Sequence, residues 1–141
     1  MAFNWYSYGQ DKAVVGMKAD STVDVIDSFA AEGAIGVGKA VERGTDPAKQ
    51  VKASVTASKV IGISIFENKV EETPLYPDKY AVPVCTFGDV WVEVGEAVTA
   101  GGAVYLSTAG AFGSSTGSAV TGMTYLTSAG SGELAIVRIR K

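Results

Sequence analysis

The sequence predicts an all-β protein, built as a jelly-roll-like β-sandwich or small barrel with an extended N-terminal arm. Three observations predict this fold class. Val and Ile together number 26 against 4 Leu, and β-branched residues favour a pleated sheet over a helix. Gly, Ser and Thr contribute 17, 12 and 11 residues, which is typical of a chain with many turns. The length of 141 residues is enough for one domain with its own core and short for two.

The first 20 residues are the predicted arm, and residues 21–141 are the predicted single β domain. The arm shows no clear periodicity, but it carries more aromatic side chains than a free polar tail needs. Trp and Tyr are favoured at interfaces, where one end of the side chain is apolar and the other meets water. We expect the arm to contact a partner, or alternatively to fold back on its own domain, through Phe3, Trp5, Tyr6 and Tyr8.

Apolar residues that alternate with polar ones predict the strands of the first half. Ile61, Ile63 and Ile65 would share one face of the strongest of these strands. Glycine and proline between residues 44 and 47 predict a loop. In chain order the expected strands cover residues 22–27, 29–33, 36–43, 51–53 and 60–67.

Residues 68–79 are predicted to form a long loop. Pro74 and Pro77 cannot donate hydrogen bonds to a strand, and loops of about a dozen residues without structure of their own are often functional. The apolar pair Leu75 and Tyr76 lies between the two prolines. It indicates either a binding protrusion or a flap that closes over one end of a barrel.

Residues 80–94 predict a β-hairpin whose turn lies at Gly88 and Asp89. Alternation after the turn directs Val90, Val92 and Val94 towards the core. Further strands are expected over residues 103–107, 123–126 and 133–140, with a flexible Ser-, Thr-, Ala- and Gly-rich loop over residues 107–122.

Composition excludes several function classes. The chain has no histidine and a single cysteine, Cys85, which excludes catalysis by histidine-containing triads, histidine-ligated zinc and thiolate clusters. We therefore expect no enzyme, no metal and no cofactor. The net charge of −3 and pI near 4.9 predict no specific nucleic-acid partner. No signal peptide is evident and no apolar run approaches the roughly 20 residues that cross a bilayer, so we expect no membrane partner.

Charge is unevenly distributed along the chain. Residues 80–137 contain no Lys or Arg, and their acids are Asp89, Glu93, Glu96 and Glu133. A monomer's surface is normally dense in mixed charge. The stretch therefore indicates either a surface that a partner covers or a core-rich half whose Ser and Thr loops meet the solvent.

Asp89, Trp91 and Glu93 would share one face of a strand. Two carboxylates beside a tryptophan are typical of sugar-binding surfaces, which makes a carbohydrate-binding or adhesion β-sandwich the alternative function. The two carboxylates would lie about 13 Å apart along the strand, too far for either glycosidase geometry. An exposed strand face, or a dimer face with a central Trp, is the interpretation that we prefer.

Four segments together resemble the motifs of tailed-phage capsid cement (decoration) proteins. In that family a VPV…G…WVEV segment leads into a V.AG.aVY segment, and here Gly102 stands where the family often has Asp. The matching segments are VVGMKADS (residues 14–21), AAEGAIGVGKAVERGTD (30–46), KVIGISIFE (59–67) and AVPVCTFGDVWVEVGEAVTAGGAVYLSTAGAFG (81–113).

This resemblance implies a non-enzymatic protein with a jelly-roll-like β domain. It would bind the major capsid protein on the outer surface of an assembled icosahedral shell and clamp neighbouring capsomers. Its location would be the virion, after synthesis in the host cytoplasm. The resemblance also implies self-association as a dimer or trimer, of which we expect the homodimer because two-fold symmetry is commonest.

Contact residues follow from the residue types that suit such a role. Extended segments reach farther than a compact core and can add strands to a partner's sheet. We expect capsid contact through the arm, through the apolar tip and through the cationic C-terminus, and self-association through two strand aromatics. The candidates for capsid contact are Phe3, Trp5, Tyr6, Tyr8, Leu75, Tyr76, Arg138 and Arg140, and those for self-association are Trp91 and Tyr105.

Overall fold

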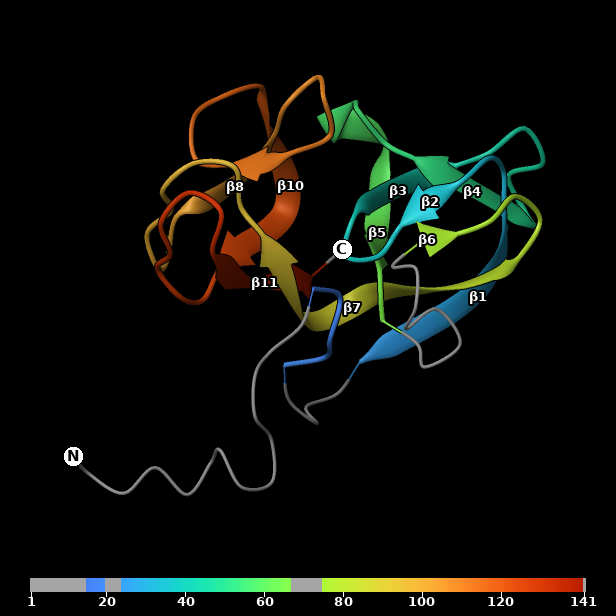
Figure 1. The fold of residues 1–141 in the computed structure, drawn as a ribbon, viewed down its shortest axis with the longest axis horizontal. Coiled ribbons are helices and arrows are strands. Elements are labelled where there is room, and N and C mark those ends of the chain that lie inside the picture. Colours follow the sequence, from blue (N-terminus) through green and yellow to red (C-terminus); the bar gives the residue numbers. More distant parts are fainter. Residues whose placement is uncertain (1–14, 20–23, 67–74, 141) are drawn as a thin grey trace.

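The computed structural model describes residues 15–19, 24–66 and 75–140, which form an almost entirely β structure (Figure 1). The helical exception among these residues is a three-residue 3-10 turn, η1, Ala57–Lys59. The predicted all-β class is confirmed, and of the predicted architectures it is a small barrel with additional strands that forms.

Eleven strands lie within the described residues. Most are short and joined by turns, as the high Gly, Ser and Thr content predicts. In chain order they are β1 Val25–Ala31, β2 Ile35–Gly36, β3 Ala40–Arg43, β4 Gln50–Ala53, β5 Val60–Ser64, β6 Leu75–Tyr76, β7 Ala81–Glu93, β8 Ala103–Leu106, β9 Phe112–Gly113, β10 Ser118–Tyr125 and β11 Leu134–Arg140.

Five strands close into a small barrel, which we call the N-terminal barrel. Their order is β1-β4-β3-β5-β7, and β7 pairs again with β1 to close the ring. β1 and β4 are parallel, whereas the other neighbours are antiparallel. The two-stranded sheet of β2 and β6 contributes to the same apolar core. That core consists of Ala31, Ile35, Val37, Val41, Val51, Tyr76, Val82 and Val84.

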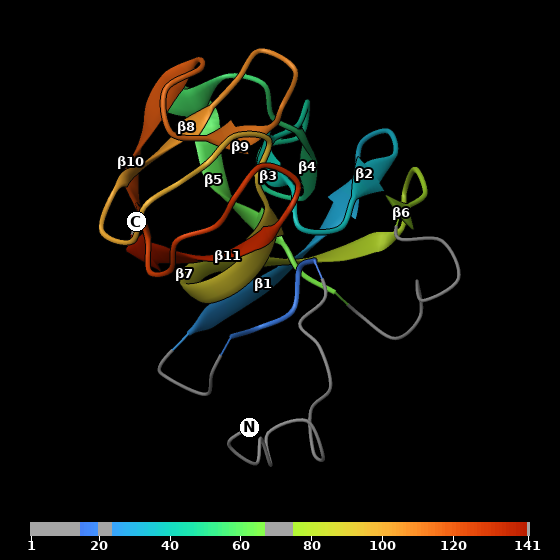
Figure 2. The ribbon, with the colours of Figure 1, turned by 60° about the vertical axis from the view of Figure 1, so that its left-hand side comes forward.

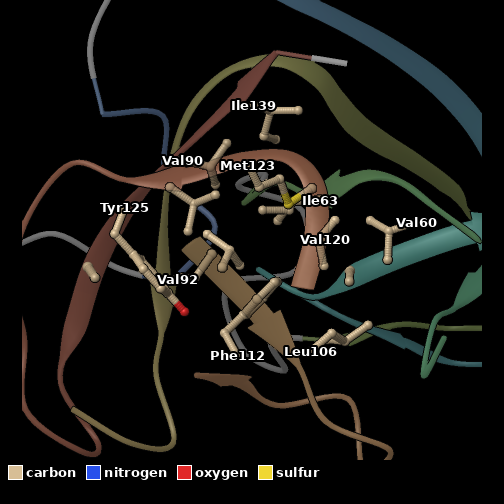
Figure 3. Packing of buried hydrophobic residues seen from close by; sticks show 14 of the residues in the cluster. Val60, Ile63, Val90, Val92, Leu106, Phe112, Val120, Met123, Tyr125 and Ile139 are labelled. Carbon is tan, nitrogen blue, oxygen red and sulfur yellow. The ribbon is translucent and has the colours of Figure 1, made fainter. Parts of the chain in front are cut away.

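β7 continues past this barrel into a second curved sheet, which we call the C-terminal half. Its order is β7-β11-β10-β8-β9, and a parallel bridge between Val94 and Phe112 brings β9 back beside the end of β7. Figure 3 shows side chains from these strands and from β5 converging on a second, larger apolar cluster. Val90, Val92 and Val94 are fully buried in it, as their alternation predicts.

The predicted hairpin at residues 80–94 is wrong, because β7 runs through this segment as one strand of 13 residues. Gly88 and Asp89 look like a turn, but Gly88 instead has φ = +144° in the middle of the strand. Before it β7 pairs with β1 and β5, and from Phe87 to Glu93 it pairs with β11. These pairings place Gly88 where β7 leaves the barrel, and β7 passes from one half of the molecule to the other (Figure 1).

Residues 15–19 run alongside the second part of β7. The Gly16 amide donates to the Trp91 carbonyl (2.7 Å), and the Trp91 amide donates to the Met17 carbonyl (2.9 Å). β1 then pairs with the first part of the same strand. The sheet thus includes the last residues of the predicted arm.

Three further expectations differ from the structure. The two strands expected at residues 22–27 and 29–33 are a single strand, β1. Ile61 packs against the barrel core while Ile63 and Ile65 join the larger cluster, because the β3–β5 pairing skips Ile61 as the extra residue of a bulge. The loop expected at residues 107–122 contains β9 and the start of β10.

Candidate functional site

The exposed large apolar side chains of the described residues all come from the first part of the chain. Two of them lie on β1, and all of them precede β7 in the chain. Within the described residues this set is Val25, Ile26, Val55, Leu75 and Tyr80, of which Tyr80 is the most exposed at 59%. Buried apolar area stabilises proteins by about 25 cal/mol per Å², so these residues are the natural starting point for an interface.

The first half of β1 has a free edge. β7 flanks β1 from Val25 to Ala30, whereas β4 flanks its other side only at Ala30 and Ala31 (Figure 2). The chain turns just before β4, where the Gln50 amide donates to the Asp46 carbonyl (2.8 Å). Because of this turn, β4 does not continue along the rest of β1. In the part of the chain that the structure describes, residues 25–29 therefore have a neighbouring strand on one side only.

A groove of about 360 Å³ lies where this free edge meets β4 and the start of β7. Two lysines line it, one from the turn before β4 and one from the turn before β7. Lys79 has φ = +72°, a left-handed conformation that non-glycine residues rarely adopt. The lining residues are Ser28, Phe29, Ala30, Ala48, Lys49, Lys79 and Ala81. This cationic groove beside an unpaired strand edge is the candidate site.

The apolar tip expected at Leu75 and Tyr76 is a flap over the barrel and not a protrusion. Leu75 is exposed, but Tyr76 is buried in the barrel core and its hydroxyl donates to the Ile65 carbonyl (2.6 Å). Tyr76 is therefore not available for capsid contact in this structure. Of the two interpretations that the sequence allows for this segment, the structure therefore has the flap.

The cationic C-terminus is engaged within the protein. The Arg138 guanidinium binds both carboxylate oxygens of Asp89 at 3.0 Å, and Arg140 lies 3.9 Å from the same carboxylate. Arg140 also stacks over the Phe87 ring, with 4.4 Å to its centroid. Both arginine side chains remain 38% exposed, so a capsid contact through them stays a prediction.

Asp89 does not lie on an exposed strand face, contrary to the prediction. Its side chain is fully buried beneath Arg138, and Lys18 donates to its main-chain carbonyl (3.1 Å). The predicted row of Asp89, Trp91 and Glu93 therefore offers a partner only one accessible carboxylate. This removes the feature that favoured a sugar-binding surface.

Trp91 and Tyr105, the predicted self-association anchors, are both half-buried and lie on strands that are not neighbours. Trp91 on β7 is opposite Ile136 of β11, and Tyr105 on β8 is opposite Ala119 of β10. β11 and β10 separate the two strands. Their role in self-association stays a prediction. The arm candidates Phe3, Trp5, Tyr6 and Tyr8 lie outside the described residues.

Ionised groups in the C-terminal half hold loops rather than form a site. Glu96 Oε1 accepts main-chain N–H bonds from Ser114, Ser115 and Thr116 (2.7, 2.7 and 2.9 Å). These bonds lower the pKa of Glu96 to about 2.

Burial raises the pKa of the Cys85 thiol, which keeps it protonated and unreactive. The described residues contain no cluster of acidic or cysteine side chains able to hold a metal ion. Among the same residues no helix has the length and apolarity needed to cross a bilayer.

Sequence reasoning missed the groove and the free edge. Lys49 and Lys79 are far apart in sequence, and only the β1–β4 and β1–β7 pairings bring their turns together. Two features of the sequence signalled the free edge. Pro47 prevents β4 from extending at its N-terminal end, and Val25 and Ile26 are adjacent apolar residues.

A family model matches nearly the whole chain, and two solved phage structures share its fold. A family model described as structural cement protein (E217 gp24/Pam3 gp6) matches residues 3–140. A chain from the capsid of Myoviridae phage XM1 is 21% identical with a TM-score of 0.74, covering 100% of this chain and 99% of that one. The head fibre gp8.5 N base of bacteriophage phi29 is 11% identical with a TM-score of 0.60, covering 84% of this chain and 95% of that one. A comparison with curated proteins finds no match.

At these identities the two solved structures show the fold, whereas the family model covers nearly the whole chain. The matched family is one of structural cement proteins of phages. The chain belongs to the phage structural cement protein family, with a capsid-associated structural role.

Proposed function

We propose that this protein binds the outer surface of the assembled major capsid protein shell and clamps neighbouring capsomers without catalysing a reaction. The observation that carries the proposal is the cement-family match over residues 3–140. The exposed apolar residues before β7 and the free edge of β1 support it, because both favour contact with another protein. The protein would act in the virion after synthesis in the host cytoplasm.

Clamping relies on many weak contacts. A ligand that binds only the assembled lattice stabilises that lattice by mass action, even where each contact is modest. Linked copies gain further by avidity. We propose a homodimer as the acting unit, with a trimer as the alternative, and Trp91 and Tyr105 as candidate contacts between copies.

Co-sedimentation with shells of the cognate major capsid protein tests this function. We expect the protein to pellet with assembled shells and to remain in the supernatant with unassembled capsid protein. Shells carrying the protein should also resist heat or chaotrope better than bare shells. Equal recovery with and without shells would contradict the proposal.

Deletion of residues 1–10 tests the role of the aromatic arm. If the arm contacts the shell, each docked aromatic contributes on the order of 1–2 kcal/mol, so the deletion should weaken binding severely. The melting temperature should then stay unchanged, because a segment that docks only on the shell adds nothing to the stability of the isolated domain. Unchanged binding would remove the arm from the interface, and a large fall in melting temperature would show that it folds back on the domain. Neutralising Arg140 should weaken binding less, since exposed ion pairs contribute about 0–1 kcal/mol.

A further inference from the structure

We propose that the free edge of β1 and the adjoining lysine groove bind an extended, acidic segment of a shell subunit, which adds to the β1–β7 sheet as a further strand. This inference rests on the proposed function and identifies the surface and the chemistry of the contact. Four features of the described residues carry it: the direction of the free main-chain groups, the exposed apolar side chains, the groove charge and the left-handed Lys79.

The main chain of β1 presents hydrogen-bonding groups outwards. The Ala31 amide donates to the Tyr80 carbonyl on the β7 side (2.8 Å), and the Ala30 amide donates to the Lys49 carbonyl on the β4 side (2.8 Å). Because main-chain groups alternate in direction along a strand, the N–H and C=O groups of Ile26 and Ser28 point to the same side as those of Ala30. β4 does not reach these two residues, so they offer a short ladder to an incoming strand.

The edge has only part of the protection that is usual for an exposed strand, namely a bulge in β7 opposite Val25 and Ile26 and one charged residue. Natural edges are short, charged, bulged or covered, since an unprotected edge pairs with other chains. Val25 and Ile26 are 45% and 41% exposed, and the single charged residue from Val25 to Phe29 is Asp27. Such a surface is suited to a partner that supplies both a main-chain ladder and apolar contacts.

The groove at the end of this edge selects for negative charge. Lys49 and Lys79 both line it, and neither has an ion-pair partner among the described residues. No acid lines the groove, and the acids of the flanking turns bind elsewhere, since Asp78 accepts from the Gly33 amide (2.8 Å) and Asp46 from the Ala48 amide (3.3 Å). A carboxylate of the incoming segment would therefore form an ion pair with these lysines.

The conformation of Lys79 also favours a binding role. A left-handed lysine is strained by roughly 1 kcal/mol or more, and such residues cluster where a ligand is held. The Lys79 amide donates to the Ala31 carbonyl (2.7 Å) and the Tyr80 amide to the Pro77 carbonyl (3.1 Å), and this turn places Lys79 in the lining of the groove beside β1.

A second copy of the chain fits this edge less well. An antiparallel pair of two β1 strands that uses the whole free stretch, residues 25–29, is centred on Asp27. That register places Asp27 opposite its own equivalent in a pair without hydrogen bonds, where side chains are closest, and like charges directly opposite are destabilising. The two-fold pair would also leave the groove lysines without the carboxylate that they select. The edge therefore favours a different chain.

The test compares two kinds of variant in binding to assembled shells of the cognate capsid protein. Ser28→Pro removes one outward N–H, and its β7 partner is Pro83, with which it shares no ladder bond. The double variant Lys49→Glu/Lys79→Glu reverses the groove charge. Lys59→Glu, at an exposed residue of η1 outside the groove, is the control for a charge reversal elsewhere on the surface. Melting temperatures identify any variant that fails to fold. If Ser28→Pro does not fold, the double variant Lys49→Glu/Lys79→Glu still tests the proposal.

We expect the charge-reversed double variant and Ser28→Pro each to weaken shell binding by about tenfold or more, and Lys59→Glu to change it by less than about twofold. Binding of the unaltered protein should also weaken as salt rises, and that dependence should diminish in the double variant. Amide hydrogen exchange at Ile26 and Ser28 should slow when shells bind.

Three outcomes would overturn the inference. Equal shell binding by all variants would exclude the edge while leaving the cement function intact. Loss of self-association without loss of shell binding would assign the edge to a second copy. Failure of the unaltered protein to bind shells would overturn the inference together with the function on which it rests.

Discussion

The two halves of the molecule share β7 but place their apolar and charged side chains differently. Within the described residues, every exposed large hydrophobic residue lies before β7, in the charge-rich part of the chain. The C-terminal half has the larger buried cluster, and its ionised groups Asp89 and Glu96 are bound internally. The low charge of residues 80–137 therefore accompanies a large core and Ser/Thr loops, while the partner surface that we propose belongs to the other half.

The largest expected effect is at the ion pair that covers the crossing point between the halves. Arg138→Ala leaves the fully buried Asp89 carboxylate with Arg140, at 3.9 Å, as its remaining ion-pair partner among the described residues. Breaking a buried pair costs about 3–5 kcal/mol, and the partial exposure of Arg138 argues for about 3 kcal/mol. Arg43→Ala, in the N-terminal barrel, removes an exposed side chain over Phe29 and should cost less than about 1 kcal/mol. Urea unfolding of both variants measures this contrast, and equal losses would contradict it.

Gly88→Ala tests whether β7 needs a glycine at the point where it passes between the two halves. A Cβ at this position would lie 2.6 Å from Lys18 Nζ, 2.9 Å from Asp24 Cβ and 3.1 Å from Cys85 Sγ, on a backbone with φ = +144°. We expect a loss of about 2 kcal/mol from strain and crowding. The control is Gly33→Ala, at φ = +80° with nothing within 4 Å of its Cβ, which should cost about 1 kcal/mol from backbone strain alone. Thermal unfolding compares the two, and a smaller effect at Gly88 would show that β7 bends there without needing a glycine.

The sequence predicts the fold class well and the connections poorly, for physical reasons that these residues illustrate. Composition and alternation are local, so they identify the β class and the burial of Val90, Val92 and Val94. Gly88 and Asp89 have the residue types of a turn, and nothing nearby in sequence shows that Arg138 covers Asp89 inside a continuous strand. The candidate groove has the same limitation, because Lys49 and Lys79 become neighbours only through pairing with β1.

A smaller loss of stability is expected when the buried tyrosine hydroxyl of either core is removed. Tyr76 donates to the Ile65 carbonyl (2.6 Å) in the N-terminal barrel, and Tyr125 donates to the Gly113 carbonyl (2.8 Å) in the C-terminal half. Replacing either by Phe leaves a buried carbonyl short of a donor, at a cost of about 1–2 kcal/mol. The double variant should show additive losses, since the two sites lie in separate clusters. A coupling larger than about 0.5 kcal/mol in chemical unfolding would show that the two cores act as one.

The smallest expected effect concerns the carboxylates that hold loops in the two halves. Glu96 binds three main-chain amides of residues 114–116, and Gly113 lets the carboxylate approach closely. In the N-terminal barrel Glu32 binds the Thr45 amide (2.8 Å) and hydroxyl. These hydrogen bonds lower the pKa of both carboxyls, to about 2 for Glu96. Because the amides stabilise the ionised form, Glu96 contributes stability above its usual pKa of 4.5, and that contribution is lost as pH falls through about 2.

Glu96→Gln should therefore lower the melting temperature most at neutral pH, and its difference from the unaltered protein should shrink between pH 4.5 and pH 2. Glu32→Gln, which loses fewer main-chain contacts, should show a smaller difference with the same sign. Scanning calorimetry across this range measures both. Amide exchange should rise at residues 114–116 in the first variant and at Thr45 in the second, since each carboxylate orders its own loop. A melting-temperature difference between Glu96→Gln and the unaltered protein that does not change with pH would contradict this prediction. Glu96 would then act through its shape alone, and the contrast between Glu96 and Glu32 would not be electrostatic.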